Sequence, residues 1–134
     1  MKQKEKRYTI EVTEHQLRLI SECVEDCHRF MAGQYELQNM TSRLDKYCEL
    51  RDELEKLKPL ITPEDPDPRS NYGWSGALCP NEHQRKFIAE TYCIYREILH
   101  FLTLETHNTE SVYNTPTLTC PESGPLPIIK PAKP

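Results

Sequence analysis

The sequence predicts an α+β protein, mainly helical, that folds as a single domain over residues 1–130. Three segments carry apolar residues at three- and four-residue spacing, which is the period of helices packed on a core. Strand-like stretches are short and lie near the two ends of the chain. We therefore expect two to three long amphipathic helices packed antiparallel, a short N-terminal strand and short C-terminal strands.

The first elements follow from local patterns near the N-terminus. Residues 7–12 alternate apolar and polar side chains, which is typical of a half-buried strand. Thr13 and Gln16 form a capping-box pattern that predicts a helix over residues 14–32. Gly33 suits the end of that helix, because glycine accepts the backbone conformation of a helix C-terminus.

The middle of the chain predicts a second helix and then a long loop. Residues 41–58 have one apolar and one charged side, and Pro59 is expected to end the helix because it lacks an N–H donor. Prolines and glycines dominate residues 59–81 and exclude helix and central strand there. A loop of this length in a small domain is either functional or disordered.

The last part of the chain predicts one further helix and an extended end. Residues 82–104 form the most apolar helix, and its wide apolar surface suits the centre of a bundle or a helix shared across a dimer. Residues 110–130 allow short strands or an extended arm. The final residues, 131–134, are expected to form a flexible tail.

The composition predicts a modest core and self-association. Of the 134 residues, 37% are hydrophobic and the mean hydropathy is −0.74, whereas a typical globular domain is about 45–50% apolar. Copies that share apolar surface would ease this shortage, so we expect a homodimer or a higher homo-oligomer.

Charge and hydropathy exclude two classes of partner. The net charge of −4 gives no broad attraction for duplex nucleic acid, although a local basic pocket for a small anion stays open. No run reaches the roughly 18 apolar residues of a membrane span, and the charged N-terminus does not resemble a signal peptide. We expect a cytoplasmic protein whose six cysteines are reduced and mostly buried.

The nearest pattern to a metal site is formed by Cys23, Cys27 and His28. The spacing places two sulfurs one turn apart on a helix face, but a zinc site needs further ligands, and the other cysteines and histidines form no paired knuckle. We expect these side chains to pack rather than to bind metal. No catalytic residue, metal or cofactor is predicted, so the chain is not expected to be an enzyme. A zinc-dependent enzyme remains a third alternative, which would require stoichiometric metal.

Four basic or aromatic side chains share one face of the third long helix: Arg85, Tyr92, Arg96 and His100. Guanidinium groups bind phosphate bidentately, histidine adds a donor and tyrosine offers a ring for a base. This face therefore has what a nucleotide site requires. The alternative is a solvated face with salt bridges to Glu90 and Glu97.

Two smaller groups of side chains also suit a planar, charged ligand. Arg29, Gln34 and Tyr35 surround Gly33 at a helix end. Tyr72 and Trp74 in the long loop are candidates for stacking. For the first group the alternative is a capped helix end with exposed polar residues. For the second, the two rings only pack the loop against the rest of the protein.

Several stretches together resemble a family of small bacteriophage proteins. They read Arg-Phe-Met-Ala-Gly-Gln-Tyr at 29–35, Asn-Tyr-Gly-Trp at 71–74 and Thr-Tyr-Cys-Ile-Tyr-Arg-Glu-Ile-Leu-His at 91–100, with similar endings at 112–119 and 124–130. The chain resembles the phage anti-Thoeris sponge proteins. Those proteins sequester the cyclic ADP-ribose signals of TIR immune enzymes, and in some members cyclic trinucleotides, without cleaving them.

The resemblance implies a homo-oligomer with a cyclic-nucleotide pocket between the first and third long helices of neighbouring copies. It implies that phosphates are held by Arg85, Arg96 and His100, and that bases are stacked by Tyr72, Trp74 and Tyr92. The residues that match the family motifs best are Arg29, Gln34, Arg96 and His100. Where relatives carry a second basic residue after the helix histidine, this chain has Phe101 and Leu102.

A second function class is a helical interaction module. Its broad apolar helix and Pro-rich tail would bind a host or phage protein. Truncation near Thr119 distinguishes this interpretation from the sponge, because only the interaction module is expected to lose a protein partner.

Overall fold

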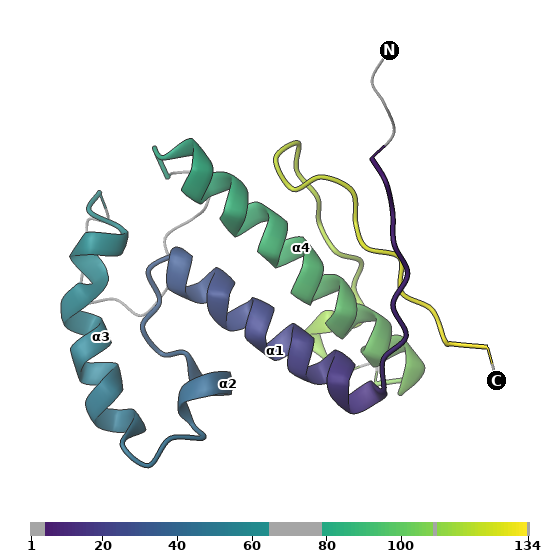
Figure 1. The fold of residues 1–134 in the computed structure, drawn as a ribbon, viewed down its shortest axis with the longest axis horizontal. Coiled ribbons are helices and arrows are strands. Elements are labelled where there is room, and N and C mark those ends of the chain that lie inside the picture. Colours follow the sequence, from purple (N-terminus) through teal and green to yellow (C-terminus); the bar gives the residue numbers. More distant parts are fainter. Residues whose placement is uncertain (1–4, 65–78, 109, 134) are drawn as a thin grey trace.

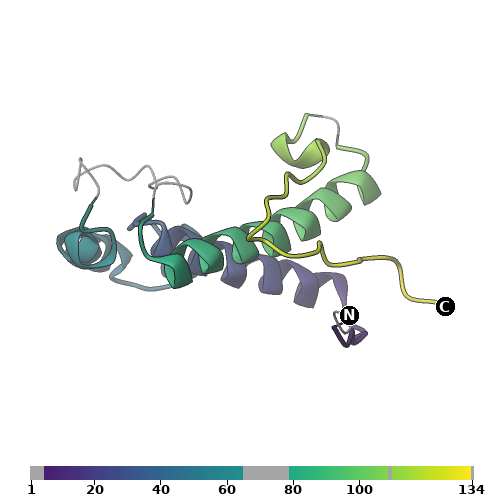
Figure 2. The same ribbon diagram turned by 90° about the horizontal axis from the view of Figure 1, so that it is seen from above.

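The computed structural model describes residues 5–64, 79–108 and 110–133, and within these ranges the fold is all-α. The elements are α1 (Glu14–Met31), α2 (Gln38–Thr41), α3 (Tyr47–Ile61), α4 (Glu82–Glu105) and the short 3₁₀ helix η2 (Val112–Asn114). The helices α1 and α4 lie side by side and antiparallel, and α3 stands apart from this pair (Figures 1 and 2). None of these helices is both long and apolar enough to span a membrane.

Both long helices begin at side chains that cap them. The Thr13 Oγ1 accepts from the backbone N–H of Gln16 at 3.1 Å, and the Gln16 Oε1 accepts from the N–H of Thr13 at 2.9 Å. The predicted capping box is therefore confirmed. Helix α4 begins in the same way, because the Asn81 Oδ1 accepts from the N–H of Gln84 at 3.1 Å. Such caps satisfy N–H groups that have no partner within the helix.

The core is small and lies mainly on α4. Among the described residues, eight apolar side chains are buried, and five of these belong to α4. They are Ile88, Cys93, Tyr95, Ile98 and Leu102. The buried residues of α1 are all polar: Ser21, Glu25 and Asp26. The α1–α4 interface therefore combines apolar packing with buried polar groups that need partners.

The second predicted helix begins later than predicted. Of the predicted range 41–58, residues 47–58 lie in α3, whereas α2 ends at Thr41 and the chain between them is not helical. The Asp26 Oδ2 of α1 accepts from the N–H of Met40 at 2.8 Å, which holds α2 against α1. The chain then turns and continues as α3.

The end of α3 also differs from the prediction, because the helix continues past Pro59 to Ile61. Proline is best tolerated in the first turn of a helix, so α3 continues past Pro59 without the hydrogen bond that an N–H at this position would donate to the Glu55 carbonyl. The N–H of Thr62 donates to the Lys58 carbonyl at 2.9 Å and closes the turn.

The side chain of Gln84 ties three helices together. Its Nε2 donates to the carbonyl of Met31 at 2.8 Å and to the carbonyl of Ile61 at 2.9 Å, which joins the ends of α1 and α3 to the start of α4. Gly33 lies at the same junction with a φ of +85°, and a Cβ there would lie 2.7 Å from the Thr62 Oγ1. This junction therefore requires glycine.

The predicted strands are absent from the described residues, so the α+β prediction is wrong. Residues 7–12 are extended but unpaired, and Tyr8 and Ile10 remain 85% and 73% exposed. Residues 110–130 hold η2, a turn over residues 121–123 and extended segments that are not paired as strands. Alternation predicts a strand only where a second strand is available to pair with it, and the α1–α4 pair offers no sheet edge.

Candidate functional site

The predicted site residues separate into three groups on the α1–α4 pair. Arg29 and Gln34 lie at the end of α1, Arg85 and Tyr92 lie on the first half of α4, and Arg96 and His100 lie further along α4. Tyr72 and Trp74 fall outside the described residues. The shared helix face predicted from the sequence therefore does not form one continuous basic surface, because each group has its own partners.

The Arg29 group is a network of polar side chains within one chain. The guanidinium donates to the Gln34 Oε1 at 2.6 Å and to the Glu25 Oε2 at 3.0 Å. Glu25 is buried and also accepts from the Asn39 Nδ2 at 2.7 Å. Because the buried carboxylate of Glu25 needs this positive partner, Arg29 stabilises the fold at the α1–α2 junction.

The Arg96 group holds the segment that follows α4. The Arg96 Nη2 donates to the Val112 carbonyl at 2.9 Å and to the Thr115 Oγ1 at 3.1 Å, and its Cζ lies 4.7 Å from the ring centroid of Tyr113. The His100 Nδ1 lies 2.7 Å from the Tyr113 carbonyl. Arg96 is buried, and among the described residues its Nη1 has no hydrogen-bond partner. Arg96 and His100, which were predicted to bind phosphate, therefore hold η2 in place. The Nη1 of Arg96 remains without a hydrogen-bond acceptor among the described residues.

A pocket of about 520 Å³ lies beside the first half of α4 and is hereafter called the Arg85 pocket. Arg85, Tyr92 and the α1 residue His28 line it, together with the segment 118–122. The Arg85 Nε donates to the Glu122 Oε1 at 2.9 Å and Oε2 at 3.0 Å, and its Nη1 donates to the Cys79 carbonyl at 2.9 Å. The pocket thus combines one guanidinium with aromatic rings.

Two rings, those of His28 and Tyr92, line this pocket, and the ring of Tyr95 packs against both of them. The centroid of His28 lies 5.8 Å from Tyr92 and 5.4 Å from Tyr95, and the two tyrosines meet edge to face at 5.8 Å. Such tilted and edge-on arrangements are the favourable geometries for aromatic rings. Burial raises the pKa of Tyr95 well above its ordinary value, so this phenol stays protonated.

His28 is a pocket residue that the sequence analysis assigned only to packing. Its Nδ1 lies 2.8 Å from the Ile88 carbonyl, and because a carbonyl can only accept, Nδ1 carries the proton. Burial lowers the pKa of His28 although this hydrogen bond opposes the change. The ring is therefore neutral at pH 7, with Nε2 as its acceptor. Only the packing of α1 on α4 brings it beside Tyr92.

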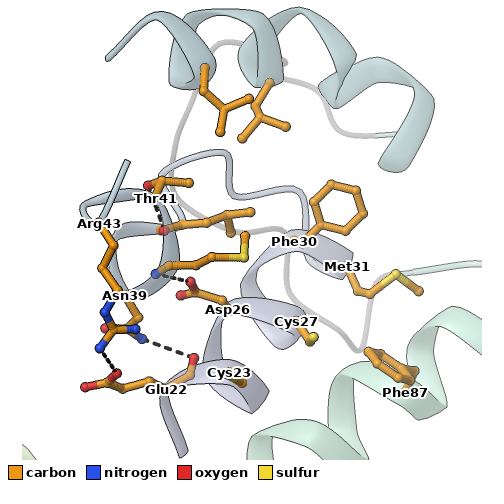
Figure 3. Close-up of a pocket in the computed structure, with 14 residues that line it drawn as sticks. Glu22, Cys23, Asp26, Cys27, Phe30, Met31, Asn39, Thr41, Arg43 and Phe87 are labelled. Atoms are coloured by element: carbon orange, nitrogen blue, oxygen red, sulfur yellow. Dashed lines mark hydrogen bonds and ion pairs between the residues drawn. The ribbon is translucent and has the colours of Figure 1, made fainter. Parts of the chain in front are cut away.

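A second pocket is an apolar groove of about 570 Å³ formed by α1, α2, α3 and Phe87 of α4 (Figure 3). Its apolar lining consists of Cys23, Cys27, Phe30, Met31, Leu37, Met40, Leu50, Leu54 and Phe87. An ion pair between Glu22 and Arg43, at 2.8 Å, is part of its lining. Residues from α1, α2, α3 and α4 meet in this groove, so the apolar pattern of residues 41–58 alone could not predict it.

The cysteines differ from the expectation of burial. Cys79 and Cys93 are buried, whereas Cys23, Cys27, Cys48 and Cys120 are exposed. Packing of α1 on α4 turns Cys23 and Cys27 away from the core and into the apolar groove. In the described part of the chain, no group of three or more histidine, cysteine, aspartate or glutamate residues is placed to hold a metal ion.

Replacing Asp26 with asparagine is expected to stabilise the protein at neutral pH. Asp26 is buried, its Oδ1 has no hydrogen-bond partner among the described residues, and burial raises its pKa. A carboxyl with a raised pKa favours folding below its unfolded pKa and loses that contribution as the pH rises through its folded pKa. Asparagine keeps an oxygen acceptor for the N–H of Met40.

The measurement is urea unfolding of wild type and Asp26→Asn between pH 4 and 8. The stability advantage of the variant should be largest near neutrality and should shrink as the pH approaches about 4, the ordinary range of an aspartate. Glu22→Gln is the control, because Glu22 is a more exposed partner in an ion pair and its loss should change stability little. A variant that is less stable than wild type at pH 7 would contradict the prediction.

The chain has no match among protein-family models, among curated proteins or among solved structures.

Proposed function

We propose that this protein is a phage anti-defence sponge that binds and sequesters a cyclic-nucleotide immune signal without cleaving it. The ligand class is a cyclic ADP-ribose isomer or a cyclic oligonucleotide, and the site of action is the host cytoplasm. One observation carries the proposal: Arg85 and Tyr92 line the same pocket of about 520 Å³. Small-molecule sites usually fall between about 300 and 1,000 Å³ and combine apolar walls with a few placed polar groups.

Each side of the Arg85 pocket has a role that suits such a ligand. The guanidinium of Arg85 offers planar, charge-assisted hydrogen bonds to a phosphate. The rings of Tyr92 and His28 offer surfaces against which a base can pack. Sequestration needs affinity alone, so the proposal requires no nucleophile, acid–base pair or cofactor.

The roles of Arg96 and His100 change in this proposal. The Arg96 Nη2 and the His100 Nδ1 contact the segment around η2, so the two side chains position that segment rather than bind phosphate through a free face. The exception is the Arg96 Nη1, which is buried and unpaired among the described residues. Arg29 likewise supports the fold through Glu25.

Self-association is part of the proposal, and the apolar groove supports it. Phe30, Met40 and Phe87 line the groove and remain 36%, 53% and 39% exposed. Leu60 on the neighbouring α3 is 80% exposed. Apolar surface gathered in this way favours contact with another protein surface. A second copy that covers the groove would supply the burial that the small core lacks.

The same groove favours a second candidate function, the helical interaction module. A helix from a host or phage protein could place its apolar side chains where a second copy would otherwise lie. The two proposals differ in the ligand: the sponge needs a nucleotide in the Arg85 pocket, whereas the interaction module needs a protein in the groove.

Native mass spectrometry with a panel of cyclic nucleotides and cyclic ADP-ribose isomers tests the proposed function. We expect an oligomer that carries an unaltered ligand. Arg85→Met should weaken binding by about 10- to 100-fold, because one charged hydrogen-bonding group contributes about 1.5–3 kcal/mol. Lys86→Met is the matched control, because it removes the same charge from the exposed neighbouring position.

The outcomes separate the two candidate functions. Protein without ligand across the whole panel would contradict the sponge, and a cleaved product would show an enzyme. A partner protein bound by the wild-type chain and lost when Leu54, which lines the groove, is replaced by aspartate, with no nucleotide bound in either form, would favour the interaction module.

A further inference from the structure

We propose that Glu122 competes with the ligand for Arg85. The Glu122 carboxylate pairs with Arg85 while the pocket is empty, and an incoming phosphate displaces it. This inference rests on the proposed function, because it assigns a regulatory contact to the same pocket. We call the Glu122–Arg85 ion pair the latch, because it is expected to open when the ligand binds.

The first support is the geometry of the ion pair. Both carboxylate oxygens of Glu122 accept from the Arg85 Nε, at 2.9 and 3.0 Å. The Nη1 of Arg85 is held separately by the backbone carbonyl of Cys79 at 2.9 Å. The carboxylate therefore takes a position that a phosphate oxygen would also take, while the contact to Cys79 keeps the guanidinium oriented.

The second support is that the pair can exchange its anion. The side chains of Arg85 and Glu122 are 28% and 39% exposed, so neither is locked in the core. Partly exposed ion pairs contribute little net stability, because water screens them. Replacing the carboxylate with a phosphate leaves Arg85 paired throughout, and the displaced Glu122 carboxylate, already 39% exposed, is solvated by water.

The third support is the turn on which Glu122 lies. The Ser123 hydroxyl donates to the Cys120 carbonyl at 2.8 Å, and the N–H of Cys120 lies 3.3 Å from the same hydroxyl oxygen. These contacts hold the turn without using Glu122. Leu118 to Glu122 line the pocket, so release of the side chain changes one wall of it.

The test measures binding of pyrophosphate to the full chain by titration calorimetry, with the Arg85 Nε–H resonance followed by NMR. We expect Glu122→Gln to bind pyrophosphate about two- to fivefold tighter than wild type, the range that a partly exposed ion pair allows. Glu110→Gln is the control, because it removes the same charge from an exposed position of the C-terminal segment. Its affinity should match that of wild type.

A double variant shows whether the effect passes through Arg85. In an Arg85→Met background, Glu122→Gln should give no gain in affinity, because the contact that it relieves is already gone. Equal affinity of wild type and Glu122→Gln, or a gain that persists without Arg85, would overturn the latch.

Cyclic nucleotides added to the same proteins separate this inference from the proposed function. If wild type and Glu122→Gln bind a cyclic nucleotide equally, the sponge stands and the latch fails. If Glu122→Gln gains affinity for pyrophosphate but no cyclic nucleotide binds either protein, the latch stands and the sponge fails.

Discussion

Replacing Gly33 with alanine is expected to lower the free energy of unfolding by about 2–5 kcal/mol. Gly33 has a φ of +85°, which strains any side chain, and the new Cβ would lie 2.7 Å from the Thr62 Oγ1 and 2.8 Å from its Cγ2. The methyl group would push α3 away from the end of α1, where Gln84 joins both helices to α4. Urea unfolding followed by circular dichroism measures the loss.

Gly124→Ala separates the two causes of that loss. Gly124 also has a positive φ, +70°, but no other group lies within 4 Å of the position that a Cβ would take there. Its replacement should therefore cost only the conformational strain, about 1–2 kcal/mol. Thr62→Ala should recover part of the stability of Gly33→Ala, because it removes the two atoms that would lie nearest to the new methyl group. Equal losses at the two glycines would show that crowding against Thr62 contributes nothing.

Arg96→Met is expected to lower the free energy of unfolding by about 2–3 kcal/mol and to release the segment around η2. The substitution removes hydrogen bonds to Val112 and Thr115 and the contact of the guanidinium with the Tyr113 ring. Hydrogen bonds to a charged donor and a partly buried cation–π contact each contribute on this scale. Urea unfolding gives the energy, and NMR signals of Tyr113 report the loosened segment.

The same variant distinguishes a positioning role from a direct contact with the ligand. If Arg96 only positions η2, Arg96→Met should retain most of the nucleotide affinity of the Arg85 pocket while its C-terminal segment loosens. If affinity disappears while the signals of Tyr113 stay unchanged, the open Nη1 of Arg96 contacts the ligand. Arg29→Met is a poor control here, because it leaves the buried Glu25 without its cation.

The site could be predicted only in part from the sequence. Spacing on one helix correctly suggested that Arg85 and Tyr92 share a surface, and they line one pocket. The spacing could not show that the Glu122 carboxylate already pairs with Arg85, since the two residues lie far apart in the chain. His28 joins this pocket from α1, and no local pattern distinguishes it from a packed histidine.

By itself the sequence determined the elements that depend on neighbouring residues. Helix α1 begins at the Thr13–Gln16 capping box, and α4 spans Glu82–Glu105, close to the predicted 82–104, because caps and apolar periodicity act within a few residues. The tertiary structure alone decided that residues 7–12 remain unpaired, that α2 and α3 separate, and that Arg96 holds η2. These outcomes depend on which distant groups are available as partners, since a strand needs another edge and a buried charge needs an acceptor.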